Sequence, residues 1–273
     1  MKTRLIVLID FSPYSETLLH LANEWGKLLH AQLLVMHQVP GLVPALADRE
    51  SRRHIIEVEK EKATARLTDL VHKHVSDALK VTYHVSEKSL LVSLSKILKQ
   101  RHEDMLLMGL KGTSTLKRIL IGSTVTKVVE YLNHVTVAVP VHVGHFIPEK
   151  LIVAVSEQYP LNEEAFGQVV HSFKGRIVHI EFVAVVAPEE DAERSSGYLG
   201  HLCARYQSEA PSSFKIFKAE SAFKEIKAYL QQEDCSMLVV QKGSRSFSDQ
   251  LFRKFLINEL VHDGSMPLII IPL

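Results

Sequence analysis

The sequence predicts an α/β fold with two tandem, open, parallel five-stranded sheets and helices on both faces of each sheet. Short apolar runs alternate with longer segments whose apolar residues recur at helical spacing, as in βαβ proteins. The order of these segments in the first half returns in the second half. A chain of 273 residues, 46% hydrophobic and 23% charged, is long enough for two globular domains. We expect these domains at residues 1–145 (the first half) and 146–273 (the second half).

The first half opens with RLIVLI (4–9), a nearly continuous apolar run that is typical of a parallel strand covered on both faces. Apolar residues at helical spacing between Leu18 and Leu29 then predict a helix. The same reasoning gives the remaining elements. Further strands are expected at 32–39, 79–85, 104–109 and 135–140, and further helices at about 44–75, 90–100 and 123–133.

The second half repeats this order. KLIVAV (150–155) corresponds to RLIVLI at an offset of 146 residues, and MPLIIIP (266–272) corresponds to HVTVAVP (134–140) at an offset of 132. Proline and glycine residues interrupt the connection between the halves. The last strands, 135–139 and 267–271, are expected at sheet edges, where their unpaired main-chain groups need cover.

Composition excludes several classes of protein. The net charge of +1 gives no electrostatic argument for binding nucleic acid or an anionic membrane. No apolar run approaches the length of a transmembrane helix, and the run after the N-terminus is too short for a signal peptide. Two cysteines, Cys203 and Cys235, fit free thiols better than a disulfide framework. We therefore expect a cytoplasmic protein.

The connection MGLKGTSTLKRILIGST (108–124) is the strongest functional signal. It is longer than the roughly 2–6 residues that join a strand to a helix in most α/β units. Its glycines allow main chain to approach a ligand closely, and the helix that follows would offer free N–H groups to a phosphate. The candidate phosphate-binding residues are Lys111, Gly112, Gly122, Ser123 and Thr124.

Other candidate residues end the neighbouring strands. Ligands of open α/β sheets bind at the carboxyl ends of the strands, where Asp10, Gln38–Val39 and Met108–Gly109 are expected. An aspartate is better suited to a ribose hydroxyl or a base than to a phosphate. The alternative is a connection without a ligand, because glycine after a strand and serine at a helix start are common in α/β proteins.

The pattern Gly109-x2-Gly112-x9-Gly122-Ser123 resembles the nucleotide loop of the universal stress protein family, in its ATP-binding branch. LIDFSPYS (8–15), LLVMHQVP (33–40) and VTVAVP (135–140) resemble strands of that family. The resemblance covers nearly the whole chain as a tandem pair of Rossmann-like domains of the HUP type.

This resemblance implies that ATP binds in the first half, with or without Mg²⁺. Asp10 and Phe11 would contact the ribose or the adenine edge, and the main chain of Gln38–Val39 would contact adenine. Met108 and Gly109 would line the ribose. Lys111, at a position where other members often carry His or Arg, and Gly112 would begin the phosphate cradle that Gly122, Ser123 and Thr124 complete.

The family's last strands pair across a two-fold dimer. The resemblance therefore implies that the two halves pair as an intramolecular pseudo-dimer, and that two chains form a homodimer. It also implies a stress-linked sensor or adaptor with a protein partner that the sequence does not identify.

The second half departs from the motif. Aligned from its last strand, it places Gln241, Ser244 and Lys254 opposite Gly109, Gly112 and Gly122, and Ser156 opposite Asp10. Side chains would fill the space that glycine leaves for phosphate, so we expect no ATP there.

Two other functions stay open. One is a nucleotide-independent interaction or scaffold module. The other is an adenylyl transferase, because HVGH (142–145) has the form of a nucleotidyltransferase motif, although it follows the last strand and not the first. We assign no catalytic residue and no metal ligand, and expect at most slow ATP hydrolysis, because the loop offers no general base.

Overall fold

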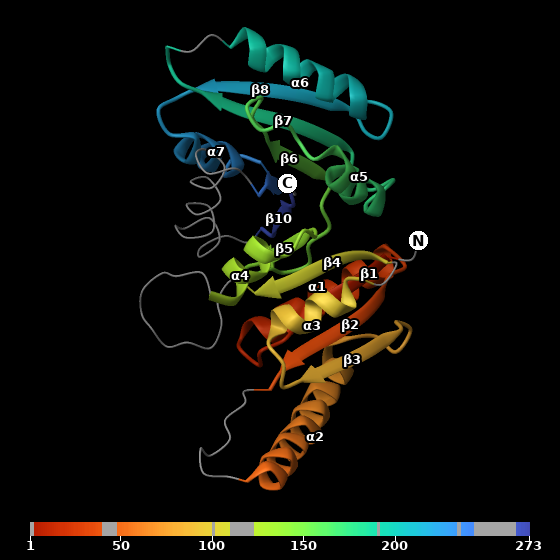
Figure 1. Cartoon of the computed structure of the whole chain (residues 1–273). Coiled ribbons are helices and arrows are strands. Elements are labelled where there is room, and N and C mark those ends of the chain that lie inside the picture. Colours follow the sequence, from red (N-terminus) through yellow and green to blue (C-terminus); the bar gives the residue numbers. More distant parts are fainter. Residues whose placement is uncertain are drawn as a thin grey trace.

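The computed structural model describes residues 3–39, 48–99, 102–109, 123–189, 192–233, 236–242 and 266–273. Strands and helices alternate along both halves, and the described strands join one ten-stranded sheet (Figure 1). The α/β class and the parallel sheets with helices on both faces are confirmed.

The elements of the first half follow the predicted order. They are β1 (Thr3–Leu8), α1 (Tyr14–Leu28), β2 (Gln32–Gln38), α2 (Arg49–His74), β3 (Val81–Ser86), α3 (Leu90–Ile97), β4 (Glu103–Gly109), α4 (Ser123–Tyr131) and β5 (Thr136–Val139).

The second half repeats the succession of strands and helices among its described residues. Its elements are β6 (Lys150–Ala154), α5 (Glu163–Ser172), β7 (His179–Val186), α6 (Glu193–Tyr206), β8 (Ser212–Lys218), α7 (Ala222–Leu230), β9 (Ser236–Gln241) and β10 (Leu268–Ile271).

The strand order is β3-β2-β1-β4-β5-β10-β9-β6-β7-β8, so each half has the same internal order and the halves meet at their last strands. Pairing is parallel within each half and antiparallel between β5 and β10, where Ala138, Val137 and Thr136 oppose Leu268, Ile269 and Ile270. We expected 135–139 and 267–271 at sheet edges. Each is outermost in its own half, but the edges of the whole sheet are β3 and β8, because β5 and β10 cover each other.

Alternation along the strands builds the core on both faces of the sheet. Leu5 and Val7 point to the face covered by α1, α2, α5 and α6, while Ile6 and Leu8 point to the face covered by α3, α4 and α7. Each strand near the centre therefore needs apolar residues at consecutive positions, which explains the continuous runs in the sequence.

The connection between the halves packs against α1. The indole Nε1 of Trp25 donates to the Phe146 carbonyl at 2.9 Å, and the Trp25 ring meets the Phe173 ring edge-to-face at 5.0 Å. Trp25 is completely buried, so one residue of α1 anchors both the connection and the second half.

Some predicted boundaries shift. The helix expected from about residue 44 begins at Arg49, because Asp48 caps it by accepting from the main-chain N–H groups of Glu50 and Ser51 at 2.9 and 2.8 Å. Among the described residues no helix combines the length and the apolar character that crossing a membrane requires. Cys203 is a half-buried free thiol whose pKa is raised by burial.

Candidate functional site

Three strands bring the predicted nucleotide residues to one end of the sheet. β1 lies between β2 and β4, with Leu8 opposite both Met36 and Met108. The residues that follow these positions therefore leave the sheet side by side. We call Asp10, Phe11, Gln38, Val39, Met108 and Gly109 the carboxyl-end site.

Asp10 shapes the turn that leads from β1 into α1. Its Oδ1 accepts from the Ser12 N–H at 3.0 Å, and Ser12 Oγ accepts from the Tyr14 N–H at 3.3 Å. The Asp10 side chain is otherwise exposed to solvent. Phe11 has φ = 58°, a left-handed conformation that bulky residues rarely adopt. The turn thus holds a carboxylate outward at the end of β1.

The Phe11 ring contacts a histidine ring and a guanidinium group. Its centroid is 4.4 Å from that of His37 on β2, and the guanidinium carbon of Arg66 on α2 lies 4.1 Å from it. His37 Nδ1 is 2.8 Å from the Ile9 carbonyl, which only accepts, so Nδ1 carries the proton. Arg66 was absent from the sequence prediction, because only the packing of α2 brings it here.

Gln38 and Val39 make contacts that support the neighbouring elements. Gln38 Oε1 accepts from the Leu90 N–H at 3.1 Å, at the start of α3. The Val39 N–H donates to the Ser86 carbonyl at 3.0 Å, and its side chain is buried. Because that N–H already has a partner, the carbonyls of this segment are the main-chain groups better placed to form hydrogen bonds with a nucleotide base.

Met108 and Gly109 end β4 against α1. Met108 is buried in the core on the side of α3 and α4. A Cβ atom at Gly109 would lie 2.7 Å from Tyr14 Cβ, closer than real contacts allow. The missing side chain at Gly109 is thus required by the packing of Tyr14, a reason that sequence analysis did not find. Burial, followed by the charge of Asp10, raises the pKa of Tyr14.

Of the residues predicted to bind phosphate, the structure describes only Ser123 and Thr124. Lys111, Gly112 and Gly122 lie outside the described residues. The main chain of Ser123 and Thr124 forms the first turn of α4, as the sequence predicts. Helix N-termini carry free N–H groups and a partial positive charge, which suit a phosphate.

The corresponding end of the second half is closed by a side chain. Gln241, at the end of β9, is 9% exposed. Its Nε2 donates to the Pro160 carbonyl at 2.9 Å, and its Oε1 accepts from the Asn162 N–H at 2.5 Å. These bonds hold the connection between β6 and α5 against β9, at the position where the first half has Gly109.

In the HVGH segment, His145 contacts α1. His145 Nδ1 is hydrogen-bonded to Glu24 Oε1 on α1, and Glu24 Oε2 accepts from the Phe146 N–H at 3.3 Å. Within the described part of the chain, no group of three or more His, Cys, Asp or Glu residues could hold a metal ion. The segment joins the connection between the halves to α1.

Comparisons with known proteins agree with this architecture. A universal stress protein from Archaeoglobus fulgidus DSM 4304 has a similar solved structure, with a TM-score of 0.70, 15% identity and 98% of each chain covered. A protein of unknown function from Pseudomonas aeruginosa PAO1 is similar too, with a TM-score of 0.62, 12% identity and coverage of 99% of this chain and 92% of the other. At these identities the likeness concerns the fold.

No curated protein sequence matches the chain. The sequence model of the universal stress protein family, in contrast, matches residues 1–143, more than half of the 273. The chain therefore belongs to the universal stress protein family.

Proposed function

We propose that this protein binds ATP, with or without Mg²⁺, in its first half alone, and acts as a cytoplasmic stress-linked sensor or adaptor. Family membership supports a stress-response role. The observation that carries the nucleotide proposal is the carboxyl-end site, which gathers Asp10, Gln38–Val39 and Met108–Gly109 at the ends of three adjacent strands. Open α/β sheets bind nucleotides at this end.

The described groups suit the adenosine part of the ligand. Asp10 is exposed and uses Oδ1 for the turn, so Oδ2 is able to accept from a ribose hydroxyl. The carbonyls of Gln38 and Val39 are able to accept from the adenine amino group. The first turn of α4, beginning at Ser123, would face the phosphates together with Lys111, Gly112 and Gly122.

The second half lacks the equivalent groups. Gln241 occupies the end of β9 with two hydrogen bonds of its own, and Ser156 replaces the aspartate. Opening this end to a nucleotide would break both Gln241 bonds, at a cost of about 1–3 kcal/mol for each buried group left unpaired. We infer that the second half supports the first through the β5–β10 pairing.

Any hydrolysis is proposed to be slow. Residues 109–124 contain no Asp, Glu or His that would act as a general base toward a water molecule. The protein would therefore act by binding the nucleotide, and a protein partner would respond to the nucleotide-bound form.

Isothermal titration calorimetry of the full chain with ATP and Mg²⁺ tests the proposal. We expect one site per chain. Asp10→Ala should weaken binding at least tenfold, and Gly122→Val should abolish it, because a branched side chain enters the phosphate path. Gly144→Val is the matched control, since a Cβ atom there meets nothing within 4 Å.

Circular dichroism of each variant separates loss of binding from loss of fold. Mass spectrometry of small molecules released from the purified chain by heat adds an independent measure. No released nucleotide and no heat with ATP would favour a nucleotide-independent interaction module. Two equivalent sites would contradict the role given to the second half, and an adenylylated acceptor would favour the transferase.

A further inference from the structure

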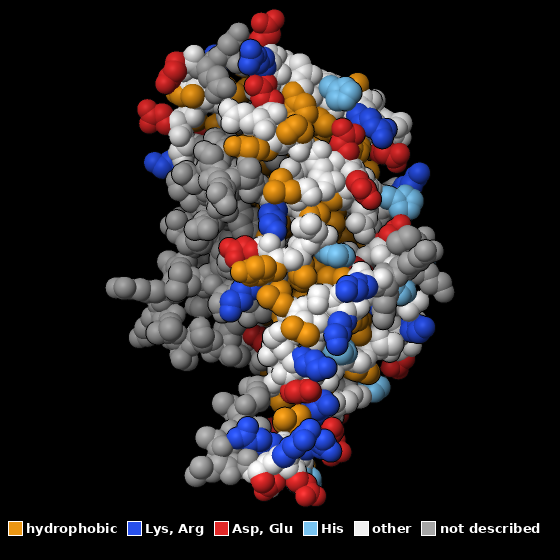
Figure 2. Space-filling view, in the orientation of Figure 1, with side chains coloured by type: hydrophobic (Ala, Val, Ile, Leu, Met, Phe, Trp, Pro, Cys, Tyr) orange, Lys and Arg blue, Asp and Glu red, His pale blue; other side chains and the backbone are white. Residues whose placement is uncertain are grey.

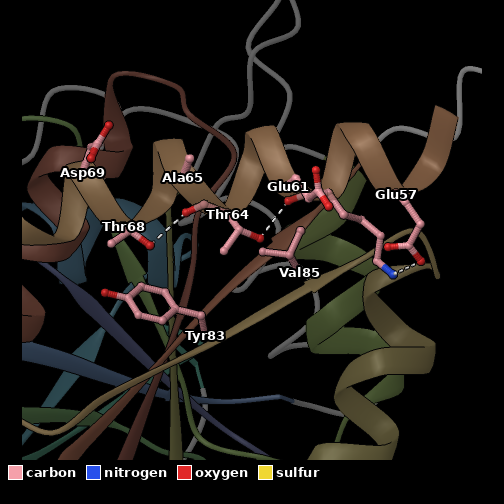
Figure 3. A pocket seen from close by; sticks show the side chains of 9 residues that line it. Glu57, Glu61, Thr64, Ala65, Thr68, Asp69, Tyr83 and Val85 are labelled. Carbon is pink, nitrogen blue, oxygen red and sulfur yellow. Dashed lines mark hydrogen bonds and ion pairs between the residues drawn. The ribbon is translucent and has the colours of Figure 1, made fainter. Parts of the chain in front are cut away.

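A groove runs between α2 and β3, at the outer edge of the first half. Seven residues of α2 line one wall, and Tyr83 and Val85 of β3 line the other (Figure 3). The α2 residues are Glu57, Lys60, Glu61, Thr64, Ala65, Thr68 and Asp69. Its volume is about 620 Å³, within the range of about 300–1,000 Å³ that is usual for binding pockets. We call it the α2–β3 groove. None of its described lining residues belongs to the carboxyl-end site.

β3 gives this groove a free row of main-chain groups. Within the described chain β3 pairs with β2 alone and ends the sheet on that side. The carbonyls of Lys80 and Ser86 accept from the N–H groups of Leu33 in β2 and of Val39 just after it. In a parallel ladder alternate residues face the neighbouring strand. The main-chain groups of Val81, Tyr83 and Val85 therefore face away from β2, on the strand that carries the Tyr83 and Val85 side chains into the groove.

The α2 wall is acidic. Glu57, Glu61 and Asp69 line it and are exposed, whereas Lys60 is the one cation among the described residues that line the groove. Lys60 Nζ lies 3.7 Å from carboxylate oxygens of both Glu57 and Glu87, so its charge is already shared. The lining therefore carries a net charge of −2 from three carboxylates and one lysine.

The β3 wall offers an aromatic surface opposite these charges. Tyr83 is 38% exposed, and Thr64 and Thr68 lie above it on α2 (Figure 3). Both threonine hydroxyls donate to carbonyls of α2 itself, to Lys60 and Thr64 respectively. An aromatic face below a row of carboxylates suits the alkyl stem and charged end of lysine or arginine.

We propose that the α2–β3 groove binds an extended, basic segment of another protein, which pairs with β3 as an added strand. Pairing to the exposed strand edge would supply affinity, and the carboxylates of α2 would select basic side chains. This proposal is independent of nucleotide binding.

The spacing of the carboxylates predicts the pattern of the partner. Glu57 and Glu61 are separated by one helical turn, about 6 Å along the axis, which is close to the distance of about 6.6 Å between alternate residues of a strand. Asp69 lies about 12 Å further along α2, a distance that about four strand residues span. A segment with Lys or Arg at positions 1, 3 and about 7 would therefore meet all three.

A second copy of the chain is a poorer occupant. Pairing of two β3 edges would bring two acidic α2 walls close to each other, which like charges oppose. The other edge, β8, carries Lys215 and Lys218, but Lys215 is bonded to Tyr229 at 2.7 Å within its own chain.

Fluorescence anisotropy with the full chain tests the proposal. The probe is a fluorescein-labelled peptide that alternates Lys and Val over eight residues. We expect it to bind at least tenfold more tightly than a Glu–Val peptide, and more tightly than a Lys–Pro peptide, because the prolines lack N–H groups and fix φ at about −65°, outside the usual range of a strand. ATP should leave these affinities unchanged.

Matched variants locate the binding. E57Q/E61Q/D69N should weaken it at least tenfold, whereas E50Q/E59Q/D77N, which removes the same charge outside the groove, should change it less than twofold. Equal weakening by both variants, or equal binding of the Lys–Pro peptide, would overturn the proposal. So would self-association of the free chain that only the groove variant abolishes, because a second copy would then be the occupant.

Discussion

Tyr14 and Gly109 touch where α1 crosses the end of β4. A Cβ atom at position 109 would lie 2.7 Å from Tyr14 Cβ and 2.8 Å from Tyr14 Cγ. The first glycine of the nucleotide motif is therefore needed for packing, whether or not a ligand is bound.

Gly109→Ala should lower the free energy of unfolding by about 1–3 kcal/mol, because α1 must move to admit the methyl group. Urea denaturation followed by circular dichroism measures this. Gly167→Ala on α5 is the control, since its Cβ atom would meet nothing within 4 Å. It should stabilise the chain by up to about 1 kcal/mol, as Ala replaces Gly in a helix. Unchanged stability in Gly109→Ala would show that Tyr14 adapts freely.

Phe11 should tolerate glycine better than alanine. Both substitutions remove the ring contacts with His37 and Arg66, but only glycine adopts φ = 58° without strain. Phe11→Gly is therefore expected to be more stable than Phe11→Ala by about 0.5–1 kcal/mol. Thermal unfolding of the two variants side by side gives the difference, and the opposite order would contradict a left-handed Phe11.

Gln241→Ala should destabilise the second half by about 1–3 kcal/mol, since the Asn162 N–H and the Pro160 carbonyl both lose a partner. Gln158→Ala, at an exposed position, is the control and should change stability by less than about 0.5 kcal/mol. Denaturation in urea compares them. If Gln241→Ala instead gains a second ATP site in calorimetry, the amide alone was blocking it.

Glu181 should stabilise the protein at neutral pH, and this stabilisation should be lost in acid. It is 3% exposed on β7 and contacts Lys150 at 2.8 Å, Lys215 at 3.3 Å and the Tyr229 hydroxyl. Burial alone would raise the pKa of Glu181, but the bonds from Lys150 and Tyr229 hold it below its ordinary value of 4.5. The folded state therefore binds fewer protons than the unfolded state, so the stabilisation is present above pH 4.5 and is lost as the pH falls through the folded pKa.

Glu181→Gln is expected to lower the free energy of unfolding by about 2–3 kcal/mol at pH 7, less than for a fully buried pair because Lys215 is half-exposed. The decrease in stability between about pH 5 and pH 3 should also become shallower. Glu209→Gln, which removes an exposed partner 3.9 Å from Lys174, should cost less than about 1 kcal/mol. Equal slopes for wild type and Glu181→Gln would place the acid sensitivity elsewhere.

Periodicity and chain order were sufficient for the fold, because continuous apolar runs and helical spacing are local signals. They also placed Asp10, Gln38 and Met108 at one sheet end, since parallel strands share that end. Three contacts could not be predicted from the sequence, because each depends on how a helix or turn packs. They are those of Arg66 with Phe11, Tyr14 with Gly109 and Gln241 with Asn162. Lys150, Glu181 and Lys215 are charged residues within three neighbouring strands, a signal in the sequence that was not used. On the face of the molecule that Figure 2 shows, other charged side chains lie among exposed hydrophobic ones.

The antiparallel pairing of Thr136–Ala138 with Leu268–Ile270 has a consequence for dilute solution. Two separate chains that met through such short strands would dissociate as their concentration fell. Here both strands belong to one polypeptide, and the covalent link keeps their local concentration high however few molecules are present. The β5–β10 pairing should therefore persist even when the protein is present in few copies. A truncated first half would expose the unpaired edge of β5, which could pair with other strands.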